Sequence, residues 1–203
     1  MQTLKQIIIN TNRYVSRYSL GFFSRFWNLV FILSNNSLRF KVSENDTCLY
    51  ISDSEDELYI SQKERAWFYF KSINNRFDTL GRMYFFEKIV FENNDIIIDC
   101  GANIGEIYNS IKLFNHNNFY YYGFEPVASE FKLVQLNTVN QITSPLALFS
   151  KNKFKKLYTY TAGADSTLIQ DNRYKEDGYV ECVRLDSILE LKGKKIKLLK
   201  LEA

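Results

Sequence analysis

The stretch DIIIDCGANIG at residues 95–105 decides the fold of this 203-residue chain. Its first part, DIIIDC, is a nearly continuous β-branched run, which is typical of a central parallel strand buried on both faces. A glycine-containing turn follows, and helical spacing continues over residues 104–114. A buried strand, a tight turn and a helix in this order indicate the start of a βαβ unit.

The same alternation continues toward the C-terminus. A second helix is expected at residues 127–139 and a short one, capped by Asp186, at residues 186–191. The segments expected to be extended are 119–124, 142–149, 155–161, 179–185 and 196–201. The pieces at 155–161 and 179–185 suggest a hairpin on the sheet edge. The order predicts an α/β fold with a doubly wound parallel sheet in the strand order 3-2-1-4.

An acidic residue at the end of the second strand points to a nucleoside cofactor. Glu125 lies 24 residues after Gly101, next to Pro126. In this position a carboxylate can accept hydrogen bonds from both hydroxyls of a ribose. The turn at Gly101 lets a ligand approach the backbone, and the helix that follows presents free N–H groups to a carboxylate or phosphate.

The composition of the turn selects among cofactors. A turn that binds NAD has the pattern GxGxxG, but here Asn103 stands in place of the second glycine. No Gly-Lys-Ser/Thr occurs, which excludes a P-loop. S-adenosylmethionine (SAM) carries a carboxylate and an ammonium but no phosphate, and it fits better. The residues predicted to bind it are Asp99, Gly101, Asn103, Gly105 and Glu125.

Four stretches also resemble, in order and spacing, the FkbM family of SAM-dependent methyltransferases. They are DCGANIG at 99–105, FEP at 124–126, VRLDSIL at 183–189 and LLKLEA at 198–203. The resemblance covers roughly residues 64–203. It implies a Rossmann-like methyltransferase fold, SAM as cofactor, and methyl transfer to a hydroxyl, commonly of a sugar or secondary metabolite.

The end of the chain departs from that family. Where the family continues with Glu-Gly-Ala-Glu, this sequence stops at Ala203. We therefore expect a methyltransferase sheet that is incomplete at its C-terminus. The strand at residues 196–201 would then be an exposed apolar edge, which favours self-association.

Two carboxylates are candidates for the base that takes the proton of an acceptor hydroxyl. Glu202 is expected at the carboxyl end of the fourth strand, beside the crevice where such sheets bind ligands. Asp165 lies in the polar loop AGADSTL, which either covers the cofactor or is an ordinary surface loop. A non-catalytic remnant or binding module of the same fold stays open as an alternative, whereas an NAD-dependent oxidoreductase is disfavoured by Asn103.

The N-terminal segment is basic and apolar. Residues 1–43 hold six basic residues and no acidic one. If residues 13–33 are helical, Val15, Tyr18, Phe22, Phe26, Leu29 and Leu33 form one stripe. This helix either packs on the domain behind it, or contacts a membrane surface or a partner. The apolar run is interrupted by Arg25 and is shorter than the roughly 20 residues a spanning helix needs.

The remaining composition bounds the function. The single histidine removes most zinc sites and Ser-His-Asp catalysis, and we expect neither a bound metal nor a nucleic-acid partner. Three cysteines without a CxxC pair fit a reducing, cytoplasmic setting. Three parts are expected: a basic helix and linker at 1–47, a hairpin and helical lead-in at 48–92, and a partial SAM-binding domain at 93–203.

Overall fold

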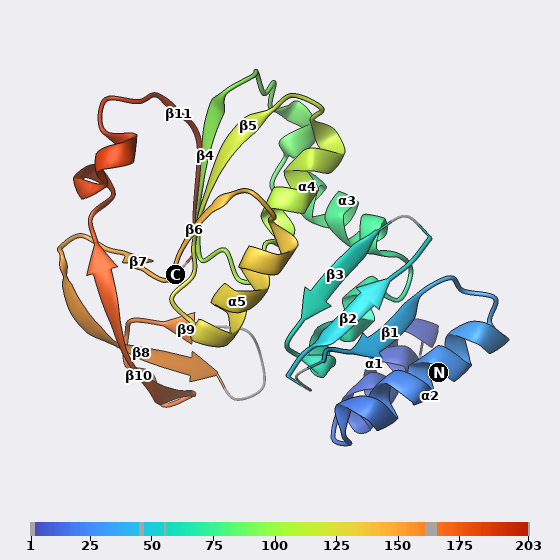
Figure 1. Cartoon of the computed structure of the whole chain (residues 1–203). Coiled ribbons are helices and arrows are strands. Elements are labelled where there is room, and N and C mark those ends of the chain that lie inside the picture. Colours follow the sequence, from blue (N-terminus) through green and yellow to red (C-terminus); the bar gives the residue numbers. More distant parts are fainter. Residues whose placement is uncertain (1–2, 45–46, 55, 161–165, 203) are drawn as a thin grey trace. The chain divides into compact units, whose positions relative to one another are not determined.

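The computed structural model describes residues 3–44, 47–54, 56–160 and 166–202. The chain divides into two compact units, Met1–Thr79 and Leu80–Ala203, and each has its own sheet structure (Figure 1). The expected three-part division of the chain stays a prediction.

The first unit begins with two helices, α1 (Leu4–Val15) and α2 (Leu20–Leu33). The prediction of one helix over residues 13–33 is therefore wrong. The Ser19 hydroxyl accepts a hydrogen bond from the backbone N–H of Phe22 (3.3 Å), which starts a new helix at this point. The backbone N–H of Ser16 donates to the Asn12 carbonyl and ends α1.

A three-stranded antiparallel sheet lies against α2. It contains β1 (Arg39–Val42), β2 (Leu49–Ser52) and β3 (Glu57–Ile60) in the order β1-β2-β3. The hairpin predicted from the sequence is confirmed as β2 and β3. Helix α2 is fixed to β1 by polar contacts, because Ser24 Oγ (2.6 Å) and Asn28 Nδ2 (2.8 Å) both donate to the Phe40 carbonyl.

The first unit continues with a 3-10 segment, η1 (Lys63–Tyr69), and α3 (Ile73–Met83), the helix within which the division into units falls. Helix α3 begins at Ile73 because the backbone N–H of Ile73 donates a hydrogen bond to Asp53 Oδ2 at 3.0 Å. Ser72 Oγ accepts from the N–H of Asn75 at 2.9 Å. From the sequence, residues 64–91 are expected to form two helical pieces that divide near Asn74 and Asn75, with Asp78 as N-cap of the second. The division instead lies before Ile73, and Asp78 lies inside α3.

The second unit contains a four-stranded parallel sheet. Its strands β4 (Asp95–Cys100), β5 (Phe119–Phe124), β6 (Ile142–Ser144) and β11 (Ile196–Leu201) have the order β11-β4-β5-β6 (Figure 1). All neighbours are parallel, which confirms the predicted order 3-2-1-4. Helices α4 (Glu106–Phe114) and α5 (Ala128–Asn137) provide the two crossovers. Among the described strands, β11 lies at one edge of this sheet.

Each face of the parallel sheet has its own apolar cluster. On one face, Ile97 and Tyr121 pack with side chains of α4 and of η2 (Phe86–Lys88). On the other face, Ile96 and Ile98 pack with Leu191. Both faces of β4 are therefore buried, as its continuous β-branched sequence predicts.

A second sheet of the same unit is a departure from the sequence expectation. It has the order β7-β10-β8-β9, with β7 (Ala147–Leu148), β8 (Lys153–Tyr160), β9 (Ser166–Thr167) and β10 (Tyr174–Val183). The predicted hairpin exists as antiparallel β8 and β10, but it belongs to this sheet and not to the edge of the parallel one.

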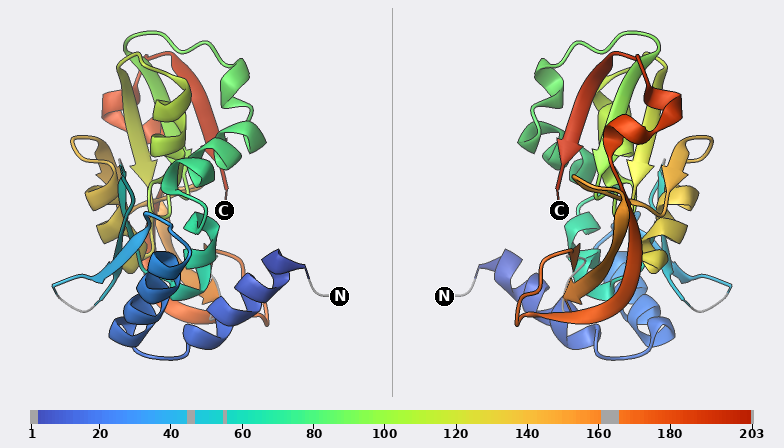
Figure 2. Two further views of the ribbon diagram at one scale, coloured as in Figure 1. Left: turned by 90° about the vertical axis from the view of Figure 1, so that its right-hand side faces the viewer. Right: turned by 90° about the vertical axis from the view of Figure 1, so that its left-hand side faces the viewer.

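Two further details differ from the expected elements. The strand expected over residues 142–149 is split into β6 and β7 at Pro145, which has no backbone N–H to donate to a ladder. The helix expected at residues 186–191 is instead a pair of 3-10 turns, η3 (Leu185–Ser187) and η4 (Leu189–Leu191). Figure 2 shows these turns in the orange to red part of the chain, before β11.

Candidate functional site

The turn after β4 is built on backbone hydrogen bonds to the neighbouring strand. The N–H groups of Gly101 (2.9 Å) and Ala102 (3.0 Å) both donate to the carbonyl of Phe124, the last residue of β5. Asn103 has a positive φ of 50°, and Gly105 is the N-cap of α4. The predicted strand, turn and helix are therefore present, although the helix starts at Glu106 and not at residue 104.

Two glycines are required in this turn for steric reasons. Gly101 has φ +75°, and a Cβ placed on it would lie 2.4 Å from the carbonyl oxygen of Glu202. Gly105 has φ +86°, and its Cβ would lie 2.5 Å from Thr138 Cγ2. Both positions combine a left-handed backbone with a close neighbour, so no other residue fits without a shift of the surrounding atoms.

Glu125 closes the turn from the tip of β5. Its Oε2 accepts a hydrogen bond from the backbone N–H of Asn103 at 2.7 Å, and its Oε1 accepts one from Val127 at 2.8 Å. The side chain is 3% exposed. Burial raises the pKa of Glu125 to about 7, although the two backbone N–H groups oppose this shift. The carboxyl group therefore titrates near neutral pH.

Asp99, the acid that precedes the turn, is fully buried. Its Oδ2 accepts a hydrogen bond from the Tyr121 hydroxyl at 2.5 Å, and its Oδ1 lies 3.0 Å from Lys200 Nζ. Burial raises the pKa of Asp99, while the Lys200 ammonium and the Tyr121 hydroxyl oppose the shift. Oδ2 thus has a hydrogen-bond partner, whereas buried Oδ1 has the Lys200 ammonium as an ion-pair partner and, among the described residues, no hydrogen bond.

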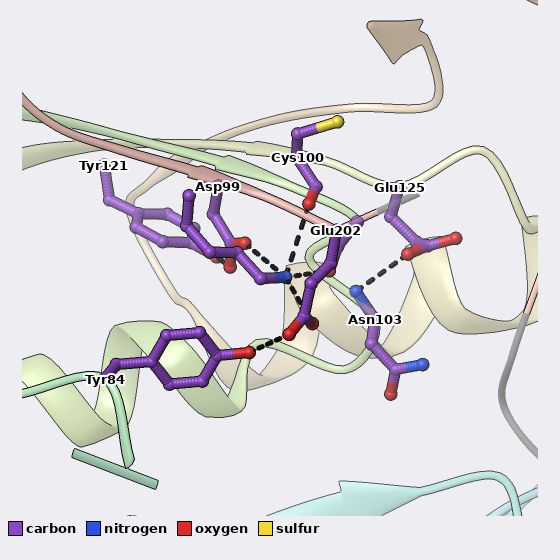
Figure 3. A network of polar contacts seen from close by, with 9 residues as sticks. Tyr84, Asp99, Cys100, Asn103, Tyr121, Glu125 and Glu202 are labelled. Carbon is purple, nitrogen blue, oxygen red and sulfur yellow. Dashed lines mark hydrogen bonds and ion pairs between the residues drawn. The ribbon is translucent and has the colours of Figure 1, made fainter. Parts of the chain in front are cut away.

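Lys200 connects the turn to the last strand. Parallel pairing places it opposite Asp99, and its Nζ donates to the Gly101 carbonyl at 2.7 Å. It also lies 3.2 Å from Glu202 Oε2. Burial by itself lowers the pKa of Lys200, but the carboxylates of Asp99 and Glu202 outweigh that effect and raise it. The ammonium is therefore charged and holds two carboxylates and the turn together (Figure 3).

Glu202 lies at the outer side of this network. Its backbone N–H donates to the Cys100 carbonyl at 3.2 Å, and its Oε1 accepts a hydrogen bond from the Tyr84 hydroxyl. The side chain is 61% exposed, whereas that of Lys200 is 6% exposed. Glu202 is thus the acid of the group that solvent reaches.

The structure brings most of the predicted site residues together. The side chains of Asp99 and Glu202 meet at Lys200, and Glu125 holds Asn103. Gly101 contacts the backbone of Glu202, whereas Gly105 contacts α5 and serves the packing of the two helices. Asp165 lies outside the described residues.

Three residues of the network were not predicted from the sequence: Tyr84, Tyr121 and Lys200. A signal for Lys200 was present, since a lysine in the apolar run IKLLKL, which was expected to be a core strand, requires a counter-ion if it is buried. Its partner depends on strand register, which pairs Lys200 with Asp99, 101 positions earlier. No local pattern marks the two tyrosines.

A small cavity lies beside the turn, at the carboxyl ends of β4 and β5. Its volume is about 40 Å³, and it lies between the turn and the second sheet of the same unit. The lining includes Gly101, Phe124 and Glu202 on the turn side, and Leu148, Leu157 and Thr167 on the other. Within the described residues, no cluster of three or more His, Cys, Asp and Glu side chains could hold a metal ion.

The fold and the site together define a class of protein. A parallel α/β sheet with a glycine turn after one strand and an acid at the tip of the next is compatible with a methyltransferase-like fold. Comparison with known families matches residues 99–202 to the methyltransferase FkbM domain, so the chain belongs to that family. This confirms the resemblance found in the sequence, and the family supports methyltransferase activity. No curated protein and no solved structure matches significantly.

Proposed function

We propose that this chain is a SAM-dependent methyltransferase with a Rossmann-like fold, and that it methylates a hydroxyl group of a sugar or another small metabolite. The observation that carries the proposal is the placement of Glu125, whose carboxylate reaches the glycine turn from the adjacent strand. Membership of the FkbM methyltransferase family supports it.

The donor set at the turn fits SAM in its chemistry. Each oxygen of Glu125 accepts one backbone N–H, and a carboxylate has further lone pairs for the two ribose hydroxyls. The N-terminus of α4 is suited to the methionine carboxylate. Asp99 is the exception among the predicted ligands. Its oxygens face Tyr121 and Lys200, so we assign it to holding Lys200 and not to direct contact with the cofactor.

The cavity beside the turn must enlarge before a cofactor can bind in it. Sites for cofactor-sized molecules have volumes of about 300 Å³ or more, which is well above the cavity of about 40 Å³ found here. Strand β9 and Leu168 contribute to its outer wall. We infer that this wall moves away from the turn when a cofactor binds.

Catalysis would rest on positioning and on removal of one proton. When bound, SAM supplies an electrophilic methyl group on a sulfonium. Glu202 would accept the proton that the acceptor hydroxyl loses as its oxygen bonds to the methyl carbon and the carbon–sulfur bond breaks. Tyr84 and Lys200 hold the two oxygens of this carboxylate in place. Asp165 remains the second candidate for this role.

A methyl-transfer assay tests the proposal. SAM with a labelled methyl group is incubated with the chain and a panel of sugars and hydroxylated metabolites, and label in an acceptor is the expected result. Glu202→Gln should lower the turnover number by at least about 100-fold with unchanged SAM affinity. Glu181→Gln, an exposed carboxylate on β10, is the control.

The same assay distinguishes the alternative, a non-catalytic binding module. A non-catalytic binding module would bind SAM but transfer no label to any acceptor. If SAM does not bind at all, the proposal is wrong in both forms.

Two further proposals concern the cellular compartment of the chain and its self-association. The three cysteines are free and buried, which supports a reducing, cytoplasmic compartment. The edge position of β11, with Leu199 41% and Leu201 65% exposed, supports self-association through residues 196–201. Leu199→Lys should then shift the chain to a smaller species in size-exclusion chromatography, and an unchanged elution would contradict pairing through this strand.

A further inference from the structure

Helix α2 has two apolar faces, and only one of them is covered. Phe23, Trp27 and Phe31 are at most 3% exposed and pack toward β1 and Phe70. On the opposite side, Phe22, Leu29, Ile32 and Leu33 are 48%, 58%, 59% and 78% exposed. The stripe expected from the sequence is thus largely the exposed face, and the residues beside it are the buried ones.

The exposed face continues onto α1 through a row of aromatic rings. Tyr14 and Tyr18 are 57% and 43% exposed, and their hydroxyls form a hydrogen bond of 3.0 Å. The ring centroids of Tyr18 and Phe22 are 4.8 Å apart. We call Tyr14, Tyr18, Phe22, Leu29, Ile32 and Leu33 the N-terminal apolar face. It spans both helices and the turn between them, in the dark blue part of Figures 1 and 2.

The charges around this face have one sign. Arg13, Arg17 and Arg25 are exposed, and within the described residues none of them takes part in an ion pair. Residues 1–43 contain no acidic side chain. The segment η1, which contains Glu64, packs against α1 through Asn12, whose side chain donates to the carbonyls of Lys63 and Glu64 at 3.0 Å. Asn12 lies about 200° around the helix from Tyr14, on the side away from the apolar face.

We propose that the N-terminal apolar face binds the surface of an anionic lipid bilayer. Large aliphatic and aromatic side chains flanked by arginines suit the boundary between headgroups and acyl chains, and the arginines complement acidic headgroups. In the described part of the chain no helix is long and apolar enough to cross a membrane. The two helices would therefore lie along the surface.

Co-sedimentation with vesicles tests the inference on the full chain. The probes are vesicles of phosphatidylcholine alone and of phosphatidylcholine with about one third phosphatidylserine. Binding is expected to the second kind only, and it should weaken as salt is raised. The triple variant Phe22→Ser, Leu29→Ser and Leu33→Ser should bind at least about tenfold more weakly.

Matched control variants distinguish binding through this face from non-specific hydrophobic adsorption to the vesicles. Phe154→Ser, Ile169→Ser and Tyr179→Ser change three equally exposed apolar side chains (69%, 72% and 66%) in the second unit, and binding should be unchanged. Replacing Arg13, Arg17 and Arg25 by Gln should weaken binding about fivefold for each arginine. The same change at the exposed Lys192, Lys194 and Lys195 should have little effect.

Two results would overturn the inference. One is equal sedimentation with both kinds of vesicle, or with neither. The other is a dimer in solution that the Phe22, Leu29 and Leu33 variant dissociates, because the face would then bind a second copy of the chain.

Discussion

Gly101 and Gly193 have nearly the same backbone conformation in very different surroundings. Their φ values are +75° and +73°, but only Gly101 has a backbone atom where a Cβ would be placed. Gly193→Ala should cost about 1–2 kcal/mol, which is the penalty of the left-handed conformation alone. Gly101→Ala should cost at least about twice as much, because the Glu202 carbonyl must also move. Urea unfolding of both variants measures the difference, and equal losses would contradict the contact.

Lys200 is predicted to be the residue on which the polar network depends. Lys200→Met leaves the Asp99 carboxylate buried without its cation, and we expect the free energy of unfolding to fall by about 3 kcal/mol or more. Lys197→Met is the matched control on the same strand. Its partner Asp95 is 3.8 Å away and both side chains are partly exposed, so the loss should stay below about 1 kcal/mol.

A double substitution separates the ion pair from simple packing at this position. Adding Asp99→Asn to Lys200→Met should restore part of the lost stability, because no unpaired charge is then buried. Additive losses in the two variants would show that the pair contributes nothing beyond its two side chains.

Glu125 gives the fold a defined pH dependence. Its pKa rises from the ordinary 4.5 to about 7 in the folded chain, so the folded state binds more protons between these values. The free energy of unfolding should therefore fall as the pH rises through this range, by up to about 3 kcal/mol from this group. Glu125→Gln stays neutral and should show a shallower fall in urea unfolding from about pH 5 to about pH 8. A variant with the full slope would assign the titration to another group.

The residues also show how far the sequence alone leads. The turn and Glu125 could be predicted because strand, glycine, helix and acid follow at characteristic spacing within one βαβ unit. Lys200 could not, because its role depends on the register between β4 and β11, which are far apart in the chain. Asp99 was found, but its orientation toward Lys200 and Tyr121 is a property of the packed core.

At the scale of the secondary-structure element, α2 shows that hydrophobic periodicity alone cannot identify which apolar side of a helix is buried. Apolar residues occupy two sides of this helix, and the periodicity left open whether the stripe through Phe22 and Leu29 packs on the domain or contacts a membrane or a partner. The choice is made by Ser24 and Asn28, whose side chains bond to β1 and turn Phe23, Trp27 and Phe31 toward the sheet. These polar contacts join residues 12 and 16 positions apart, and no helical spacing reveals them.

A pair of alanine variants tests the orientation of α2. Phe31→Ala removes a ring that contacts Trp27, Phe40 and Phe70, and it should cost about 3–5 kcal/mol. Leu29→Ala, two residues earlier on the exposed face, should change stability by less than about 0.5 kcal/mol. Thermal unfolding distinguishes the two, and a larger loss at Leu29 would reverse the assignment of the faces.

On the scale of the whole molecule, the parallel sheet was the best predicted feature. Its order β11-β4-β5-β6 follows from the alternation of strands and helices around the buried β-branched strand β4 and from right-handed crossovers. The second sheet was not foreseen for two reasons. Pro145 divides one expected strand between two sheets, and the residue pattern of the β8–β10 hairpin does not indicate which strands pair with it. That sheet contributes the outer wall of the cavity beside the turn, so it bears directly on cofactor access.

The central claim is that the turn at residues 99–105 and Glu125 form a site for SAM. Calorimetric titration of the chain at about pH 8, where Glu125 is ionised, tests it most directly. We predict saturable binding of SAM with one site per chain and no heat with NADH. Glu125→Ala should weaken SAM binding by about 1–3 kcal/mol through the loss of hydrogen bonds to the ribose. Tight binding of NADH without any heat from SAM would contradict the account.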